Sequence, residues 1–322
     1  MNNIVRVIIL FCTNLAVYGA EQEIGCSYVS YGLCGRLGDS LLSYSHAEWL
    51  SYRYNLPILY SEFKYSNELK LVTKAVFKIK EENYCRVNYA FLKKKSQSKF
   101  KSKIIYEVPY FSDFPEENNK GFLVDWADPV FRKRIRESIA PLHEIALFNP
   151  QTEILSIAVH IRTVGGYDPE CIRQGFPHKF CDLDFYVEAI KKFAKLMENR
   201  FCYVRVFSDA VDPIELIKKL QSKLEGFSNI LLEDDFSRSE THTVLADFFS
   251  LSLYPVLIRS QSNFSYMAAR IGVTCLEVFP KILLGDNGEY SYEIQLMRMR
   301  YNDEMHSAQI VNQVDEIYLK LQ

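Results

Sequence analysis

The chain has 322 residues, of which 48% are hydrophobic and 24% are charged, and its formal net charge is -2. This composition excludes a disordered protein, because it supplies enough apolar side chains for a large core, and the length favours two domains of roughly 150 residues each. A net charge so close to zero gives no overall attraction to phosphate backbones, so we expect no nucleic-acid partner.

Residues 1–20 have the layout of a secretory signal peptide. Arg6 precedes an apolar stretch over 7–17, and the small residues Gly19 and Ala20 follow it. This stretch is shorter than the roughly 20 residues that a membrane span needs. We therefore expect export through the secretory pathway. An uncleaved N-terminal anchor and a first strand of the fold are the alternatives, and only the anchor would hold the protein at a membrane.

The eight cysteines are compatible with export. Cys26 with Cys34, and Cys171 with Cys181, could each close a short disulfide, and buried reduced thiols are the alternative. No cysteine spacing matches a zinc site. We therefore expect no zinc site built on the cysteines.

From residue 24 the chain is predicted to form a strand over 24–30, a helix over 40–54 and a second strand over 57–61. The first strand and the helix are joined by the loop GLCGRLGD, which includes Gly35 and Gly38. Glycines allow a tight turn and a close approach of the backbone to a ligand. The protein is thus expected to open with a β-α-β unit.

The remainder of the first half is expected to hold a helix with a strand over 65–80, a strand over 104–108 and a helix over 129–142. Asp128 is placed to cap the last of these helices, ahead of a proline in its first turn. Asn149 and Pro150 form a natural boundary. We therefore predict an N-terminal domain over 21–148 and a C-terminal domain over 149–322.

The second half alternates between strand and helix. Strands are predicted over 154–159, 203–207, 230–232, 256–259 and 275–279, and helices over 183–198, 213–224, 241–253, from about 265 onward and over 312–322. Such alternation predicts a parallel sheet with helices on both faces, and hence an α/β protein.

Polar residues follow three of these strands, and the carboxyl ends of parallel strands meet at one edge of a sheet. His160 and Arg162 follow the first, Asp209 follows the second, and the serine-rich turn over 260–265 follows the fourth. An arginine fork suits phosphate. The turn leads into a helix, whose first N–H groups also attract anions.

We therefore predict an anion site at this edge. The alternatives are a surface ion pair for Arg162 and simple helix capping by Ser262 or Ser265.

Three segments, in order, resemble the GDP-fucose-dependent fucosyltransferases of the GT-B superfamily, which act on glycans or on proteins. They are GRLGDSLLSYSHAEWLSYRYNLPILY from Gly35, VHIRTVGGYD from Val159 and ADFFSLSLYPVLIRSQSNFSYMAARIG from Ala246. The resemblance implies a GT-B-like fold of two Rossmann-like domains facing a central cleft. It also implies inverting transfer of fucose from GDP-fucose to a glycan or glycoprotein hydroxyl, without a metal or other cofactor.

The resemblance implies a role for each matching residue. Arg162 would bind the β-phosphate and stabilise the leaving diphosphate, and His160 would support that loop or contact the nucleotide. Gly35, Arg36 and Gly38 would form the loop that closes over the donor. The other implied donor contacts are Ser260, Ser262, Asn263, Phe264 and Ser265, with Asp209 and Asp247 as nucleotide contacts or structural acids.

Inverting transfer needs a base for the acceptor hydroxyl. The candidates are Asp168, Glu170, His178 and Asp39, of which Asp168 is slightly favoured. Asp39 and Ser40 stand where the family often has asparagine and glutamine, and Thr163 follows the H-x-R motif, where relatives often continue with another arginine or a close aspartate. A GT-B-shaped binding protein without turnover, and a transferase for another nucleotide sugar, are the alternative functions.

Overall fold

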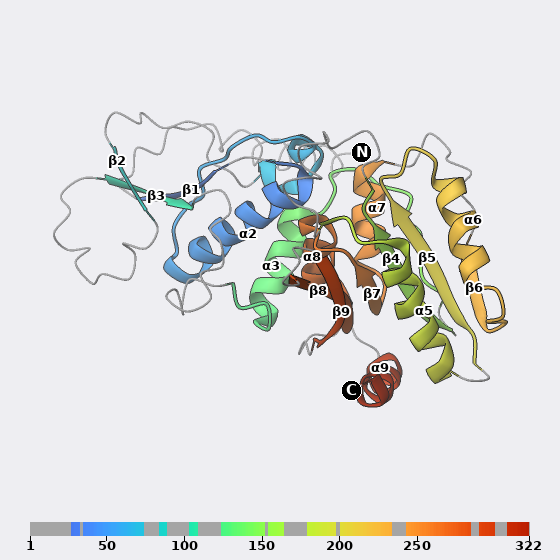
Figure 1. Cartoon of the computed structure of the whole chain (residues 1–322). Helices are drawn as coiled ribbons and strands as arrows, with labels where there is room; N and C mark the ends of the chain where they lie inside the picture. Colours follow the sequence, from blue (N-terminus) through green and yellow to red (C-terminus); the bar gives the residue numbers. More distant parts are fainter. Residues whose placement is uncertain are drawn as a thin grey trace, which may run out of the picture.

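Two sheets, parallel except for one edge strand, form the framework of the protein, with helices packed against them (Figure 1). The computed structural model describes residues 27–32, 35–73, 84–88, 103–108, 124–151, 154–163, 179–197, 200–233, 243–284, 290–299 and 308–321. The predicted signal segment lies outside these ranges. Figure 1 shows one sheet near each end of the molecule, with α2, α3 and α8 between them.

The first sheet has the strand order β1-β3-β2 and all its strands are parallel. Its strands are β1 (Tyr28–Tyr31), β2 (Tyr84–Asn88) and β3 (Lys103–Val108). The strand predicted over 104–108 is thereby confirmed, and β1 overlaps the strand predicted over 24–30 at residues 28–30, whereas β2 was not predicted. The segment 57–61 is not a regular strand. It meets β1 only at a bridge, where Val29 N–H donates to Pro57 O at 2.9 Å and Leu59 N–H donates to Val29 O at 2.7 Å.

The second sheet has the order β6-β5-β4-β7-β8-β9. Its strands are β4 (Leu155–Ile161), β5 (Cys202–Ser208), β6 (Ile230–Glu233), β7 (Val256–Arg259), β8 (Leu276–Leu284) and β9 (Tyr290–Arg298). All neighbouring pairs are parallel except β8 with β9. The chain starts in the middle at β4, moves outward through β5 and β6, and then returns to β7 on the other side. This is the Rossmann order, and the reversal between β4 and β7 is the point where such sheets bind ligands.

Helices cover both faces of the second sheet, as predicted. They are α5 (Leu183–Met197), α6 (Pro213–Lys223), α7 (Val244–Leu251), α8 (Asn263–Ile271) and α9 (Ala308–Leu321). Along β4, Ile157 and Val159 join the cluster built on α5, α6 and α9, while Ala158 joins the cluster that includes α7 and α8. This alternation follows from the two-residue period of a strand. The α/β prediction is confirmed, and the division into domains at residue 148 stays a prediction.

The apolar cluster on the α7 and α8 face continues into the first half of the chain. It includes side chains of α2 (Leu37–Tyr54) and α3 (Pro129–Ile139). Fully buried Arg132 of α3 reinforces the connection, because its guanidinium donates to the carbonyls of Arg270 and Gly272 at 3.2 Å and 2.5 Å. The two halves therefore share one core.

Several element ends differ from the predictions. Helix α2 starts three residues earlier than expected, because Asp39 in its first turn accepts a hydrogen bond from the Arg36 N–H at the N-cap. Helix α3 ends at Ile139, but its cap is as predicted, since Asp128 accepts from the first-turn N–H groups. The described part of 65–80 forms only the short 3-10 helices η1 (Ser66–Glu68) and η2 (Lys70–Thr73).

At the other end of the chain, the strand expected over 275–279 is the start of the longer hairpin β8–β9. The acidic residue Glu233 ends β6 and pairs with Arg205 at 3.1 Å. Cys202 and Cys275 are buried free thiols, whereas Cys26, Cys34 and Cys171 lie outside the described residues. No helix among the described residues is long and apolar enough to cross a bilayer.

We expect Glu277→Gln to be strongly destabilising. Glu277 is fully buried on β8 and accepts hydrogen bonds from Arg259, at 2.6 Å, and from Arg270. Burial alone would raise the pKa of Glu277, but the two guanidinium groups outweigh it and lower the pKa below its ordinary value. Removing the carboxylate leaves two buried cations without their counter-charge, so urea unfolding should show a loss of about 3–5 kcal/mol.

The matched control is Glu293→Gln, which removes an exposed pair with Lys281 at 3.1 Å across the same hairpin. This change should cost less than about 1 kcal/mol. Equal losses for the two variants would contradict the role given to Glu277.

Candidate functional site

The carboxyl ends of β4 and β7 bring together most of the predicted donor residues. His160, the second-last residue of β4, is only 7% exposed, and its ring stacks on Phe264 with centroids 5.5 Å apart. Burial, and then the charges of Arg162, Arg259 and Arg36, lower the pKa of His160 to about 3. The imidazole is therefore neutral at physiological pH. Its buried Nδ1 has no hydrogen-bond partner among the described residues, so it is available to a ligand.

The turn after β7 places a helix N-terminus beside His160. Ser262 is the N-cap residue of α8, but its side chain makes no capping hydrogen bond. The Ser265 hydroxyl donates to Ser262 O at 3.3 Å instead of accepting from the backbone. The interpretation of these serines as simple caps is therefore wrong. The first N–H groups of α8 carry the positive end of its dipole without a side-chain cap.

The glycine loop packs directly on this helix end. Gly35 has φ 75°, a left-handed conformation that favours glycine. Gly38 is required for a different reason, because a Cβ there would lie 2.3 Å from Phe264 N. The first turns of α2 and α8 therefore touch through backbone atoms. Segments that the sequence separates by more than half the chain form one site.

Asp39 lies between the two helix ends. Its Oδ1 accepts from Asn263 Nδ2 at 2.7 Å, and its Oδ2 accepts from Arg36 N–H at 3.0 Å. Both oxygens are thus used to join α2 to α8. A carboxylate here also offsets the positive ends of both helices. These contacts give Asp39 a structural role, and they explain why an acid is tolerated at this position.

Asp209 has a similar structural role at the end of β5. It accepts from Thr163 N–H at 2.6 Å and from the Thr163 hydroxyl at 3.2 Å, and it faces Arg36 Nη1 at 3.8 Å. Burial raises the pKa of Asp209, although Thr163 and Arg36 oppose the shift. Asp209 thereby joins the ends of β4 and β5 to the glycine loop. Asp247 lies further back in α7, next to Phe248, whose ring contacts Phe264 at 5.4 Å.

Arg162 follows β4 with its guanidinium over the ring of Phe180, 5.2 Å from the centroid. The base candidates that follow it, Asp168, Glu170 and His178, lie outside the described residues. They remain predictions, as does any geometry between them and Arg162.

Two buried residues that support the site were missed by the sequence analysis. Tyr186 of α5 is fully buried, and its hydroxyl lies beside the Ser260 side chain and the Arg162 backbone, with burial raising the Tyr186 pKa well above its ordinary value. Neither the Tyr186 nor the Ser260 hydroxyl has a hydrogen bond of good geometry in the described structure. Arg259 ends β7 and donates to Ser260 O at 3.1 Å. Tyr186 belongs to no sequence motif, and Arg259 lies inside the segment that begins at Ala246 but was given no role there.

The assembled site is suited to an anion with an attached ring system. Arg36 and Arg162 supply guanidinium groups, α2 and α8 supply two positive helix ends, and His160 and Phe264 supply aromatic surface. Across the described ranges, no group of three or more histidine, cysteine, aspartate or glutamate side chains is arranged to hold a metal ion.

Comparisons with known proteins show similarity only at the level of structure. No protein-family model matches the sequence, and no curated protein matches it. An Arabidopsis thaliana FUT1 variant in complex with GDP is 14% identical, with a TM-score of 0.48 over 79% of this chain and 70% of that chain. Fucosyltransferase NodZ from Bradyrhizobium is 13% identical, with a TM-score of 0.49 over 85% of this chain and 99% of that chain. POFUT1 in complex with GDP is 13% identical, with a TM-score of 0.38 over 78% of this chain and 96% of that chain.

We expect Gly38→Ala to separate the first turns of α2 and α8. The added methyl group would meet the backbone of Phe264, which cannot rotate away as a side chain could. Overpacking of this kind costs about 1–3 kcal/mol. Urea unfolding measures the loss, and hydrogen exchange at the Phe264 amide should become faster.

Ser43→Ala is the control. It also introduces alanine at a buried position of α2, but it removes the hydroxyl oxygen and adds no atom. It should leave exchange at Phe264 unchanged. Unchanged stability and exchange in Gly38→Ala would show that the helices do not meet at Gly38.

Proposed function

We propose that the protein is a glycosyltransferase that takes a sugar from a nucleoside diphosphate and transfers it to a hydroxyl group of a glycan or glycoprotein. The three sequence segments that resemble GDP-fucose-dependent enzymes make GDP-fucose the favoured donor. The transfer would invert the anomeric centre and would not need a metal.

The observation that carries this proposal is the meeting of positive groups at the switch point of the second sheet. Arg36, Arg162 and the N-termini of α2 and α8 converge there, beside the unpartnered Nδ1 of His160. A diphosphate is the chemical group that such a set of donors recognises best, because it carries several charges and several acceptor oxygens. The adjoining aromatic rings of His160 and Phe264 suit the nucleoside.

The proposed chemistry assigns a separate task to each group. The acceptor oxygen attacks the anomeric carbon while the bond from that carbon to the β-phosphate oxygen breaks, and the electron pair leaves with the diphosphate. Arg162, helped by Arg36 and the helix ends, stabilises this developing negative charge. The proton of the acceptor hydroxyl passes to a base.

The contacts in the site narrow the choice of that base. With a pKa of about 3, His160 is a poor base, and it acts instead as a hydrogen-bond partner of the donor. Both oxygens of Asp39 already accept hydrogen bonds within the protein. Asp168 therefore remains the proposed base, and Asp39 is reassigned from catalysis to positioning.

Arg162→Ala should abolish transfer while leaving the fold intact. Losing a positioned charge at the leaving group costs about 10²–10³ in turnover. The measurement is product formation from GDP-fucose with a broad set of glycan and peptide acceptors, detected by mass spectrometry, together with calorimetric titration of GDP. Arg53→Ala, at the exposed far end of α2, is the control and should behave as the unmodified protein.

Near-normal turnover in Arg162→Ala would show that this arginine does not stabilise the leaving group. GDP binding without transfer to any acceptor would favour a binding protein without turnover. If the protein does not bind GDP but transfers a sugar from another nucleotide sugar, the donor assignment changes. If it neither binds GDP nor transfers any sugar, the proposal is overturned.

Asp39→Asn should retain most of the activity. The amide keeps the shape of the side chain, and Asn263 can turn its carbonyl oxygen toward it, so turnover should fall by no more than about fivefold, or roughly 1 kcal/mol. Asp39→Leu is the contrasting variant, because it removes both hydrogen bonds and should weaken GDP binding. Complete loss of turnover in Asp39→Asn with unchanged GDP affinity would instead identify Asp39 as the base.

A further inference from the structure

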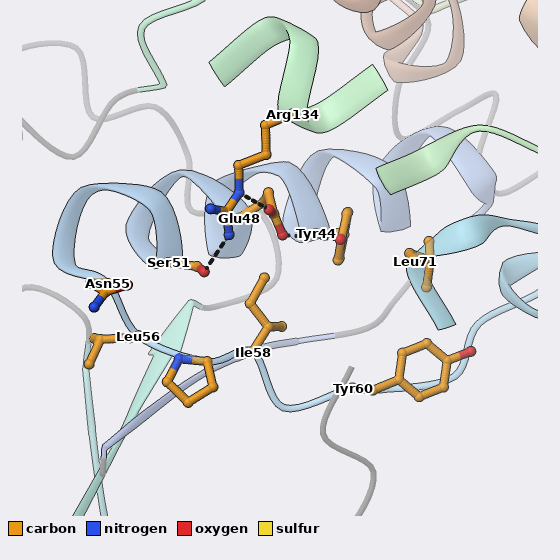
Figure 2. A pocket seen from close by; sticks show the side chains of 10 residues that line it. Tyr44, Glu48, Ser51, Asn55, Leu56, Ile58, Tyr60, Leu71 and Arg134 are labelled. Atoms are coloured by element: carbon orange, nitrogen blue, oxygen red, sulfur yellow. Dashed lines mark hydrogen bonds and ion pairs between the residues drawn. The ribbon is translucent and has the colours of Figure 1, made fainter. Parts of the chain in front are cut away.

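A second hollow lies along α2, away from the candidate nucleotide site. It has a volume of about 340 Å³ and is lined by Tyr44, Glu48, Ser51, Asn55, Leu56, Pro57, Ile58, Tyr60, Leu71 and Arg134 (Figure 2). This volume falls within the roughly 300–1,000 Å³ of small-molecule sites. Leu37 opens α2 at the nucleotide site, and Glu48 lies about 16 Å further along the helix axis. The two sites are therefore distinct.

One wall of this α2 cavity is a hydrogen-bonding surface built around an ion pair between a buried carboxylate and a partly exposed guanidinium. The Glu48 side chain is 5% exposed and pairs with Arg134, whose own side chain is 42% exposed. Tyr44 Oη donates to Glu48 Oε2 at 3.1 Å, and Arg134 Nη2 donates to Ser51 Oγ at 3.1 Å. Figure 2 shows Glu48, Ser51 and Arg134 gathered on the same side of the cavity. A carboxylate and a guanidinium have more hydrogen-bonding positions than these contacts occupy.

The opposite wall is mostly apolar. Ile58 rises toward Glu48 in Figure 2. Leu56 and Pro57 also line this wall. The Tyr60 hydroxyl bonds to Ser66 Oγ at 2.7 Å, which fixes the ring and directs its polar end away from Glu48. Asn55 adds an amide at the rim, where the left-handed C-cap of α2 turns the chain.

The pairing of the charges determines which ligands suit the cavity. An anion that approached Arg134 would meet the carboxylate of Glu48, and a cation that approached Glu48 would meet the guanidinium. A purely apolar ligand would leave the hydrogen-bonding wall unsatisfied. The favoured ligand is neutral, carries hydroxyl groups on one face and presents C–H groups on the other.

We propose that the α2 cavity binds a neutral sugar ring. Hydroxyl groups of the sugar donate to Glu48 and accept from Arg134 and Asn55, while its C–H face lies on Ile58, Pro57 and Tyr60. This proposal rests on the cavity alone and holds whether or not the protein transfers a sugar. If it does, the cavity holds a part of the glycan remote from the reacting hydroxyl.

The test is saturation-transfer NMR and calorimetry of the protein with galactose, mannose, N-acetylglucosamine and lactose as probes. At least one probe should bind with a millimolar dissociation constant. Ile58→Trp fills the cavity, and Arg134→Lys keeps the charge beside Glu48 but removes the planar fork, so each should weaken binding at least tenfold. Arg136→Lys, on the same helix but not lining the cavity, should leave binding unchanged.

Glucosamine and glucuronic acid test the charge argument, and both should bind at least tenfold more weakly than the best neutral probe. GDP should not displace the sugar, which separates this site from the nucleotide site. Melting temperatures show whether Ile58→Trp folds. If it does not fold, the binding measured with Arg134→Lys tests the proposal. Failure of every neutral probe to bind, binding that survives both variants, or displacement by GDP would overturn the proposal.

Discussion

The contact between the first turns of α2 and α8 is the constraint on which the candidate site depends. Gly38 allows the two backbones to meet, and the hydrophobic cluster that surrounds them contains residues from both halves of the chain. Without this contact, Arg36 of the glycine loop would not reach the ends of β4 and β5. The price of the arrangement is that two positive helix ends lie close together. Asp39 offsets part of this charge, and a bound anion would offset more.

The buried ion pairs divide the arginines into two groups. Arg259 and Arg270 share Glu277 and are held beneath the site by it. Burial, Arg162, Arg259 and Arg36 together lower the pKa of His160, so its ring stays neutral. Arg36 and Arg162 lie nearer the surface of the site and are the cations that a ligand would meet. Arg259 and Arg270 thus provide a fixed positive charge beneath the site, while Arg36 and Arg162 can adjust to a ligand. This combination suits binding and release of a charged group.

Much of the second sheet could be predicted from the sequence, because its buried parallel strands are short apolar runs with clear turns between them. The strand over 256–259 matches β7 at both ends. Strand β9 was missed although its residues alternate between apolar and polar from Tyr290 to Leu296, which is the pattern of a strand with one covered face. The start of α2 was missed because an arginine, which is not a usual N-cap residue, stands at its N-cap position.

The site was predictable only as far as strand ends reveal it. His160, Arg162 and the serine turn each follow an apolar run, so the topology of a parallel sheet brings them together. In the sequence, Tyr186 occupies an apolar position of an amphipathic helix. Its spacing does not distinguish it from the other buried residues of that helix. The structural tasks of Asp39 and Asp209 depend on contacts between distant segments. For these two acids the sequence suggests a catalytic or ligand-binding role. Only the fold shows that their carboxylate oxygens already accept hydrogen bonds from the protein.

Helix α2 connects the two proposed sites. Its residues are buried almost continuously from Leu37 to Ser51, so it is held on nearly every side and cannot shift without disturbing the common core. Its first turn belongs to the nucleotide site and its later turns form one wall of the α2 cavity. A rigid helix therefore fixes the spacing between the two at about 16 Å. Two parts of one extended ligand, or a donor and a distant part of its acceptor, would be held at that separation by the fold itself, without any moving element.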